Sequence, residues 1–194
     1  MVPNYVPEFL VQDTFTRANS ASTLGSAETG QAWTARGGST WGISSNKGYL
    51  ASTANGAMWA DLDIATLDST VECDVTLSSV RASAGICVRS NGVSYGLLCR
   101  LRKYTGADFI EIYNGSSFIG QVSSAGLVLG TTYRLKVVSL GNNVDLYLDG
   151  VSKISVSSGT QNVAGRTKAG LFVWRGSAND DDGGSRWDNF TVAT

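Results

Sequence analysis

The stretch YRLKVVSLGNNVDLYLDGVSKISV, residues 133–156, decides the fold class. Apolar and polar side chains alternate with a period of two through 133–139, 144–149 and 151–156, the pattern of strands with one buried face. The turn sequences Gly141-Asn142-Asn143 and Asp149-Gly150 separate these runs, and such residues tolerate the positive φ angles of tight hairpin turns. The stretch therefore predicts three consecutive antiparallel strands.

The same pattern recurs along the chain. A run over 109–113 meets a second run over 118–122 across Asn114-Gly115, and Asn55-Gly56 and Asn91-Gly92 are further hairpin signals. About a dozen strands at spacings of roughly 8 to 12 residues are typical of a sandwich or barrel. We expect an all-β protein, a two-sheet antiparallel β-sandwich.

Composition narrows the function classes. The 194 residues include 23 Gly and no His, and the net charge is -1. Without His, Ser-His-Asp triads and His-ligated zinc are excluded, and a balanced charge gives no field for nucleic acid. No apolar run is long enough to insert in a membrane. The first eight residues lack a signal-peptide pattern, so we expect synthesis in the cytoplasm.

The domain is expected to span residues 12–194, preceded by an extended arm over 1–11. The arm carries the apolar residues Tyr5, Val6, Phe9 and Leu10, which suit packing either on the domain itself or on a neighbouring subunit. Cys73, Cys87 and Cys99 lie in apolar runs without metal-ligand spacing, so buried free thiols are expected, with one bridge between neighbouring strands as the alternative.

One acidic pair and one basic pair are candidate sites. Glu72 and Asp74 share one face of a predicted strand, but Thr76 stands where a third acid would complete a glucanase pattern, so no enzyme is expected. Arg100 and Arg102 are expected on a solvated or subunit-facing strand.

A carbohydrate-binding rim is predicted at Trp174, Arg175, Asp180 and Asp182, because aromatic faces stack on sugar rings while polar neighbours bond hydroxyl groups. The run from Asp180 to Gly184 also suits calcium chemically. Three other tryptophans, Trp33, Trp41 and Trp187, are expected in the core.

Several segments resemble modules of bacteriophage minor tail proteins, notably of phages of actinobacteria, with a concanavalin-like or laminin-G-like jelly roll. The segments that carry the resemblance are 13–19, 24–33, 40–46 and the closing 187–192. It implies that the first and last strands pair, which brings Asp13 near Asp188, and that a structural calcium ion lies between them.

The resemblance also implies a virion structural protein, either a surface decoration or a minor tail protein, with other virion proteins and copies of itself as partners. The virion is then its location. The alternative is a lectin-like receptor-recognition module of the tail that binds a host cell-wall glycan.

Overall fold

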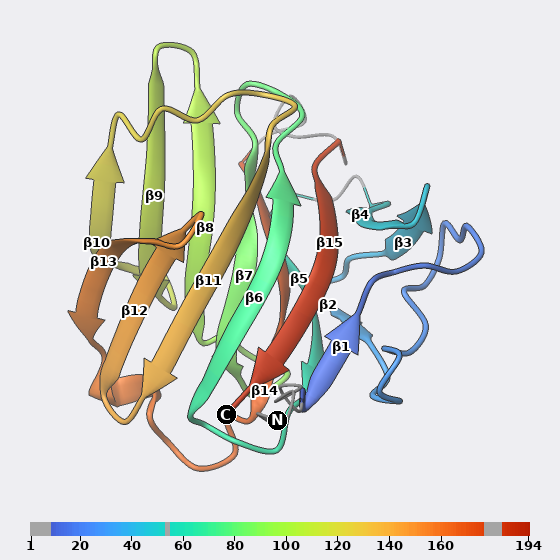
Figure 1. The fold of residues 1–194 in the computed structure, drawn as a ribbon, viewed down its shortest axis with the longest axis horizontal. Helices are drawn as coiled ribbons and strands as arrows, with labels where there is room; N and C mark the ends of the chain where they lie inside the picture. Colours follow the sequence, from blue (N-terminus) through green and yellow to red (C-terminus); the bar gives the residue numbers. More distant parts are fainter. Residues whose placement is uncertain (1–8, 53–54, 177–183) are drawn as a thin grey trace, which may run out of the picture.

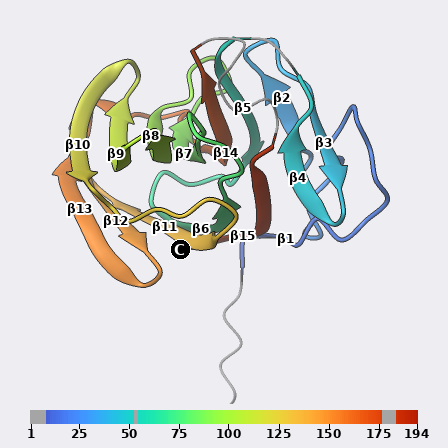
Figure 2. The same cartoon turned by 90° about the horizontal axis from the view of Figure 1, so that it is seen from above.

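The computed structural model describes residues 9–52, 55–176 and 184–194. In these ranges fifteen strands form two antiparallel sheets that face each other (Figure 1), and the view from above shows the two layers (Figure 2). The predicted two-sheet β-sandwich is confirmed. Across the same ranges, no helix is long and apolar enough to cross a membrane.

The first sheet has eight strands, and β1 joins it by pairing with β15. Its order is β13 (Val151–Ser157), β12 (Asn143–Leu148), β11 (Thr132–Leu140), β6 (Ser69–Thr76), β15 (Arg186–Ala193), β4 (Lys47–Leu50) and β3 (Trp41–Ser44), with β1 at Val11–Asp13.

The second sheet has seven strands. Its order is β10 (Ser117–Ser123), β9 (Ala107–Asn114), β8 (Leu97–Tyr104), β7 (Ser83–Ser90), β14 (Lys168–Arg175), β5 (Gly56–Asp63) and β2 (Thr34–Arg36). A short 3-10 helix, η1 (Gly159–Gln161), follows β13.

Most of the predicted turns lie where the sequence indicated. Asp149 and Gly150, with φ angles of 50° and 78°, join β12 directly to β13. Strand β9 continues through Asn114, so the next turn falls on Gly115 and Ser116. The hairpin predicted at Asn55-Gly56 is wrong, because β4 and β5 belong to different sheets and the chain crosses between them.

Alternation along each strand fills the space between the sheets. In β6, Val71, Cys73 and Val75 are fully buried while the intervening side chains face outward. Trp41 packs against Trp187 with ring centroids 5.1 Å apart, and the Trp187 indole N–H donates to the Gly85 carbonyl of the second sheet, 2.8 Å away. The prediction that Trp33, Trp41 and Trp187 belong to the core is confirmed.

The three cysteines are free and buried, as expected. Burial raises the pKa of each thiol well above its ordinary range, because the thiolate would lose its hydration. These thiols therefore behave as small apolar side chains.

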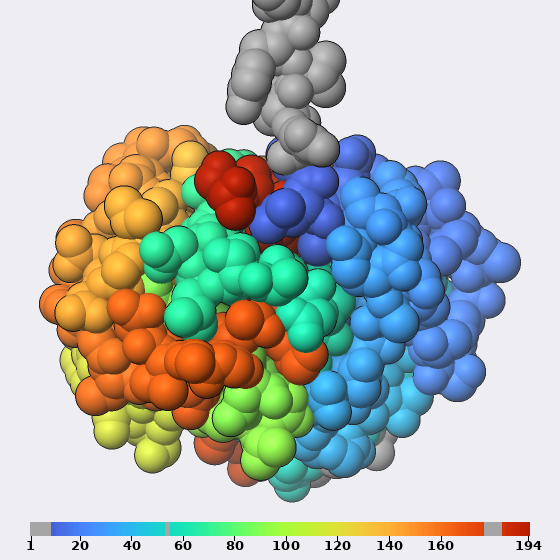
Figure 3. All heavy atoms as spheres, turned by 90° about the horizontal axis from the view of Figure 1, so that it is seen from below, coloured from blue at the N-terminus to red at the C-terminus, as the bar shows by residue number. Residues whose placement is uncertain are grey.

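The sandwich begins earlier than residue 12. Val11 is fully buried in β1, and the backbone N–H of Leu10 already donates to the Val192 carbonyl at 2.8 Å. Figure 3 shows this end of the molecule, where the start of the chain (blue) lies beside the last strand (red). The backbone of Leu10 is thus paired with the last strand while its side chain stays 36% exposed, and Phe9 is half-buried. Tyr5 and Val6 lie outside the described residues.

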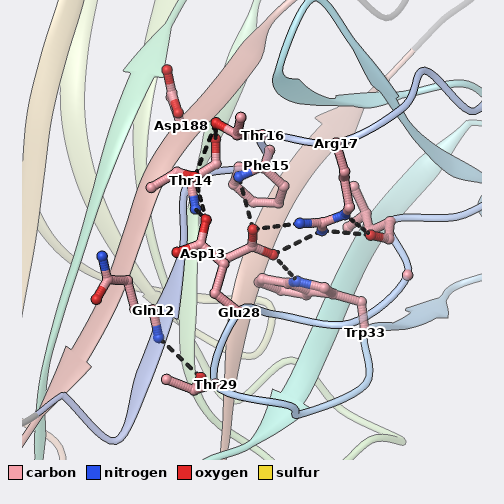
Figure 4. A network of polar contacts seen from close by, with 12 residues as sticks. Gln12, Asp13, Thr14, Phe15, Thr16, Arg17, Glu28, Thr29, Trp33 and Asp188 are labelled. Carbon is pink, nitrogen blue, oxygen red and sulfur yellow. Dashed lines mark hydrogen bonds and ion pairs between the residues drawn. The ribbon is translucent and has the colours of Figure 1, made fainter.

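The carboxylate of Asp13 ties the first strand to the segment that follows it (Figure 4). Arg17 donates to both of its oxygens, at 2.7 and 2.9 Å, and the Trp33 indole N–H donates at 2.6 Å. The backbone N–H of Phe15 donates at 2.7 Å. Because Asp13 is fully buried, these four hydrogen bonds replace the water that its charge has lost.

Replacing Asp13 with Asn should destabilise the fold by about 3 kcal/mol, because Arg17 and Trp33 lose a charged acceptor inside the protein. Asp188→Asn is the matched control: its ion pair with Lys47 is partly exposed, and its loss should cost under about 1 kcal/mol. Urea unfolding of both variants measures the difference, and equal losses would contradict this role of Asp13.

Candidate functional site

The second sheet buries side chains on its outer face as well as on its inner face. All eight residues of β7 are buried, although alternate side chains point away from the other sheet. On the outer side, Trp59, Leu98 and Phe172 form a separate apolar cluster with Cys87. Tyr95, from the β7–β8 loop, covers this cluster with edge-on ring contacts of 5.5 Å to Trp59 and 5.2 Å to Phe172.

Hydrogen bonds hold two of these rings in place, those of Tyr95 and Trp59. The Tyr95 hydroxyl donates to the Gly115 carbonyl at 3.1 Å, and burial raises its pKa, against the opposite effect of the Arg100 charge. The indole N–H of Trp59 donates to the buried carboxylate of Asp61, which also accepts from Ser90 at 2.6 Å. The apolar cluster is therefore held in one arrangement.

A buried ion pair lies beside this cluster. Glu111 of β9 is fully buried, and the Arg100 Nε of β8 donates to its Oε2 at 2.9 Å. The Arg102 Nη2 lies 2.7 Å from Glu111 Oε1. The angle is outside hydrogen-bond geometry, so this contact is an ion pair without a hydrogen bond. One carboxylate is thus shared by two guanidinium groups.

Aromatic rings support both arginines. The Arg100 guanidinium carbon lies 4.5 Å from the centre of the Tyr113 ring. The Arg102 guanidinium carbon lies 4.6 Å from that of Phe109 and 4.9 Å from that of Tyr104. Cation–π contacts of this kind fix the planes of the side chains.

A hollow of about 330 Å³ opens between the apolar cluster and the ion pair. In the register of the sheet, Gly85 stands between Phe172 and Arg100, so no side chain fills this place in the row. A Cβ atom there would lie 2.1 Å from the Cys99 carbonyl oxygen, so only glycine fits. The lining residues are Tyr95, Leu98, Arg100, Tyr113, Gly115, Ser116 and Trp174.

The structure describes two of the four residues of the predicted sugar rim, and they differ in position. Trp174 lines the hollow and keeps 41% of its surface exposed. Its neighbour Arg175 is buried, with 2% exposed, and does not line the hollow. Asp180 and Asp182 lie outside the described residues. Of the two predicted rim residues that the structure describes, Trp174 lines the hollow and Arg175 does not, and the other lining residues were not predicted.

Arg100 and Arg102 were expected on a solvated or subunit-facing strand, but both contact the buried Glu111 of their own sheet. The exposed fraction of the Arg100 side chain is 7%, because Glu111 lies directly across the β8–β9 hairpin. A sequence signal for this pair existed: a turn centred on Thr105 and Gly106 aligns Arg100 with Glu111. Opposite charges that face each other across two strands stabilise the pairing.

The geometry around Asp13 and Asp188 does not fit the expected calcium ion. The first and last strands do pair, as predicted. However, the Asp13 oxygens already accept from Arg17, Trp33 and Phe15, and Asp188 pairs with Lys47 at 3.2 Å, apart from this network in Figure 4. No group of three or more potential metal ligands occurs in the described ranges.

Glu72 and Asp74 lie on the outer face of the first sheet, as predicted. Arg134 bridges them, with Nε 3.0 Å from Glu72 and Nη1 3.2 Å from Asp74. Burial alone would lower the pKa of Arg134. The hydrogen bonds and charges of the two carboxylates outweigh this effect, so the pKa is raised overall. One cation is thus shared by both carboxylates.

No protein-family model matches the chain, and no curated protein matches it by sequence. Among solved structures, it is similar to the carbohydrate-binding module CBM66 from Bacillus subtilis, with a TM-score of 0.65 and 19% identity over 84% of this chain and 95% of that one.

A second similar structure is domain 4 of AbnA, an extracellular arabinanase from Geobacillus stearothermophilus, in complex with arabinotriose. The TM-score is 0.54, with 13% identity over 95% of this chain and 91% of that one. At these identities the likeness shows the fold. Nothing in it supports the expected identity as a phage tail protein.

Exposure separates the roles of two tryptophans on the outer face. Trp174→Ala should lower the free energy of unfolding by about 1 kcal/mol at most, because 41% of this residue's surface is exposed and it belongs neither to the core nor to the cluster under Tyr95. Trp59→Ala should cost about 3 to 5 kcal/mol, because it empties the cluster under Tyr95. Chemical denaturation measures both, and a large loss for Trp174→Ala would show that this ring is structural.

Proposed function

We propose that the chain is a non-catalytic carbohydrate-binding module, and that a glycan binds in the hollow on the outer face of the second sheet. The observation that carries the proposal is the placement of two aromatic rings, Trp174 and Tyr113, in the lining of one hollow with a fixed arginine. Aromatic faces stack on the apolar faces of sugar rings, and N–H groups bond their hydroxyls.

Pre-organisation favours this place over other surfaces of the sandwich. Glu111 fixes Arg100, and the Gly115 carbonyl and two rings fix Tyr95, so a ligand meets side chains that need little further ordering. Side chains that are already ordered lower the entropy cost of binding. The hollow is of the size that small-ligand sites occupy, which starts at roughly 300 Å³.

The similar structures support the same reading. CBM66 is named as a carbohydrate-binding module, and domain 4 of AbnA was solved with arabinotriose. Binding without hydrolysis agrees with the ion pairing of Glu72 and Asp74 to Arg134. A place on a virion, with other virion proteins or further copies as partners, stays a separate prediction, and glycan binding does not depend on it.

Trp174→Ala should weaken glycan binding about tenfold or more, because it removes a stacking surface while the fold is kept. A glycan array identifies a ligand, and calorimetry then measures the affinity. Tyr147→Ala is the matched control, an aromatic residue of β12 in the other sheet, and should leave the affinity unchanged. Unchanged binding by Trp174→Ala would overturn the proposed site.

A further inference from the structure

Arg100 presents unused hydrogen-bond donors to the hollow. Its side chain is more than nine-tenths buried, yet it lines the hollow. Within the described ranges, Glu111 is its one hydrogen-bond acceptor, and the bond uses Nε. The two Nη groups have no protein acceptor there, and neither of them is among the buried polar atoms without a partner. They are therefore accessible to a ligand.

Among the described residues around the hollow, the charges do not cancel. Two guanidinium groups, Arg100 and Arg102, share the single carboxylate of Glu111, which leaves one net positive charge. The neighbouring ion pairs, Lys103 with Asp108 and Arg36 with Asp61, are each neutral. In the part of the chain that the structure describes, no other residue that lines the hollow carries a charge. An anion bound in the hollow would neutralise this positive charge.

The surroundings strengthen that attraction. Tyr95, Leu98 and Trp174 form much of the wall, so water is partly displaced and the effective dielectric constant is below that of bulk solvent. The Arg100 plane is held from one side by Glu111 and from another by the Tyr113 ring. A fixed guanidinium fork matches the two oxygens of a carboxylate, whereas a sugar hydroxyl accepts weaker bonds.

We propose that the hollow selects glycans that carry a carboxylate, which the Nη groups of Arg100 bind while a sugar ring packs on Trp174. This inference rests on the proposed function and specifies its ligand as an acidic sugar. Uronic acids and sialic acids share the required group, and Glu111 acts as the residue that positions Arg100.

The direct test compares each acid with its own methyl ester, which keeps the shape and removes the charge. Trigalacturonic acid and sialyllactose, each with its ester, are titrated calorimetrically into the intact protein. At least one acid should bind about tenfold or more tightly than its ester, as a charge-assisted bidentate contact implies. The difference in affinity between the acid and its ester should become smaller at 1 M salt, because screening weakens the attraction between the carboxylate and Arg100. The two arms show which source of the carboxylate is preferred.

Substitutions of Arg100 test whether this residue causes the preference for the acid over its ester. In Arg100→Met the acid and its ester should bind equally, while Arg100→Lys, which keeps the charge but loses the fork, should retain a smaller preference. Trp174→Ala should weaken the acid and the ester alike. The acid and ester comparison on the unchanged protein still decides the matter if Arg100→Met fails to fold.

The outcomes separate the two proposals. Equal affinity of acid and ester, with both weakened by Trp174→Ala, would overturn the acidic-sugar inference and leave the binding module standing. Failure of both acids to bind while a neutral glycan binds through Trp174 would do the same. Binding that ignores Trp174→Ala would remove the proposed site itself, and with it the role of Arg100.

Discussion

The second sheet must bury apolar side chains on both of its faces, and the rest of the site depends on this constraint. Its inner face packs on the first sheet, but among the described residues no further sheet covers its outer face. The β7–β8 loop brings Tyr95 over Trp59 and Phe172, which covers one part. The hollow opens next to this cover, beside Arg100, whose partner on β7, Gly85, has no side chain.

Charge on the outer face follows from the same constraint. A carboxylate buried at Glu111 is tolerated only with close cations, and Arg100 and Arg102 provide them from the adjacent strand. Since two cations meet one anion, the face keeps positive charge next to exposed aromatic rings. The arginines that stabilise the buried Glu111 thus also provide groups that suit recognition of an acidic sugar.

Much of the fold could be predicted because its signals are local. Alternation over 133–156 and the Asp149-Gly150 turn gave the right strands, and β6 exposes Glu72 and Asp74 as expected. The site was harder, because Trp174 and Tyr113 come from strands separated by β7 and β8 in the sheet. Periodicity also assigns outward residues to solvent, so it misplaced Arg100, which is buried by a partner across a hairpin.

The five indole N–H groups offer the most direct measurement of the central claim that ligands bind at the hollow. Those of Trp33, Trp41, Trp59 and Trp187 donate to protein acceptors, whereas in the described ranges that of Trp174 has none. In a 15N–1H NMR titration with a glycan that binds, the Trp174 indole signal should shift most. A saturated complex in which that signal is unmoved, while another indole signal shifts, would contradict the account.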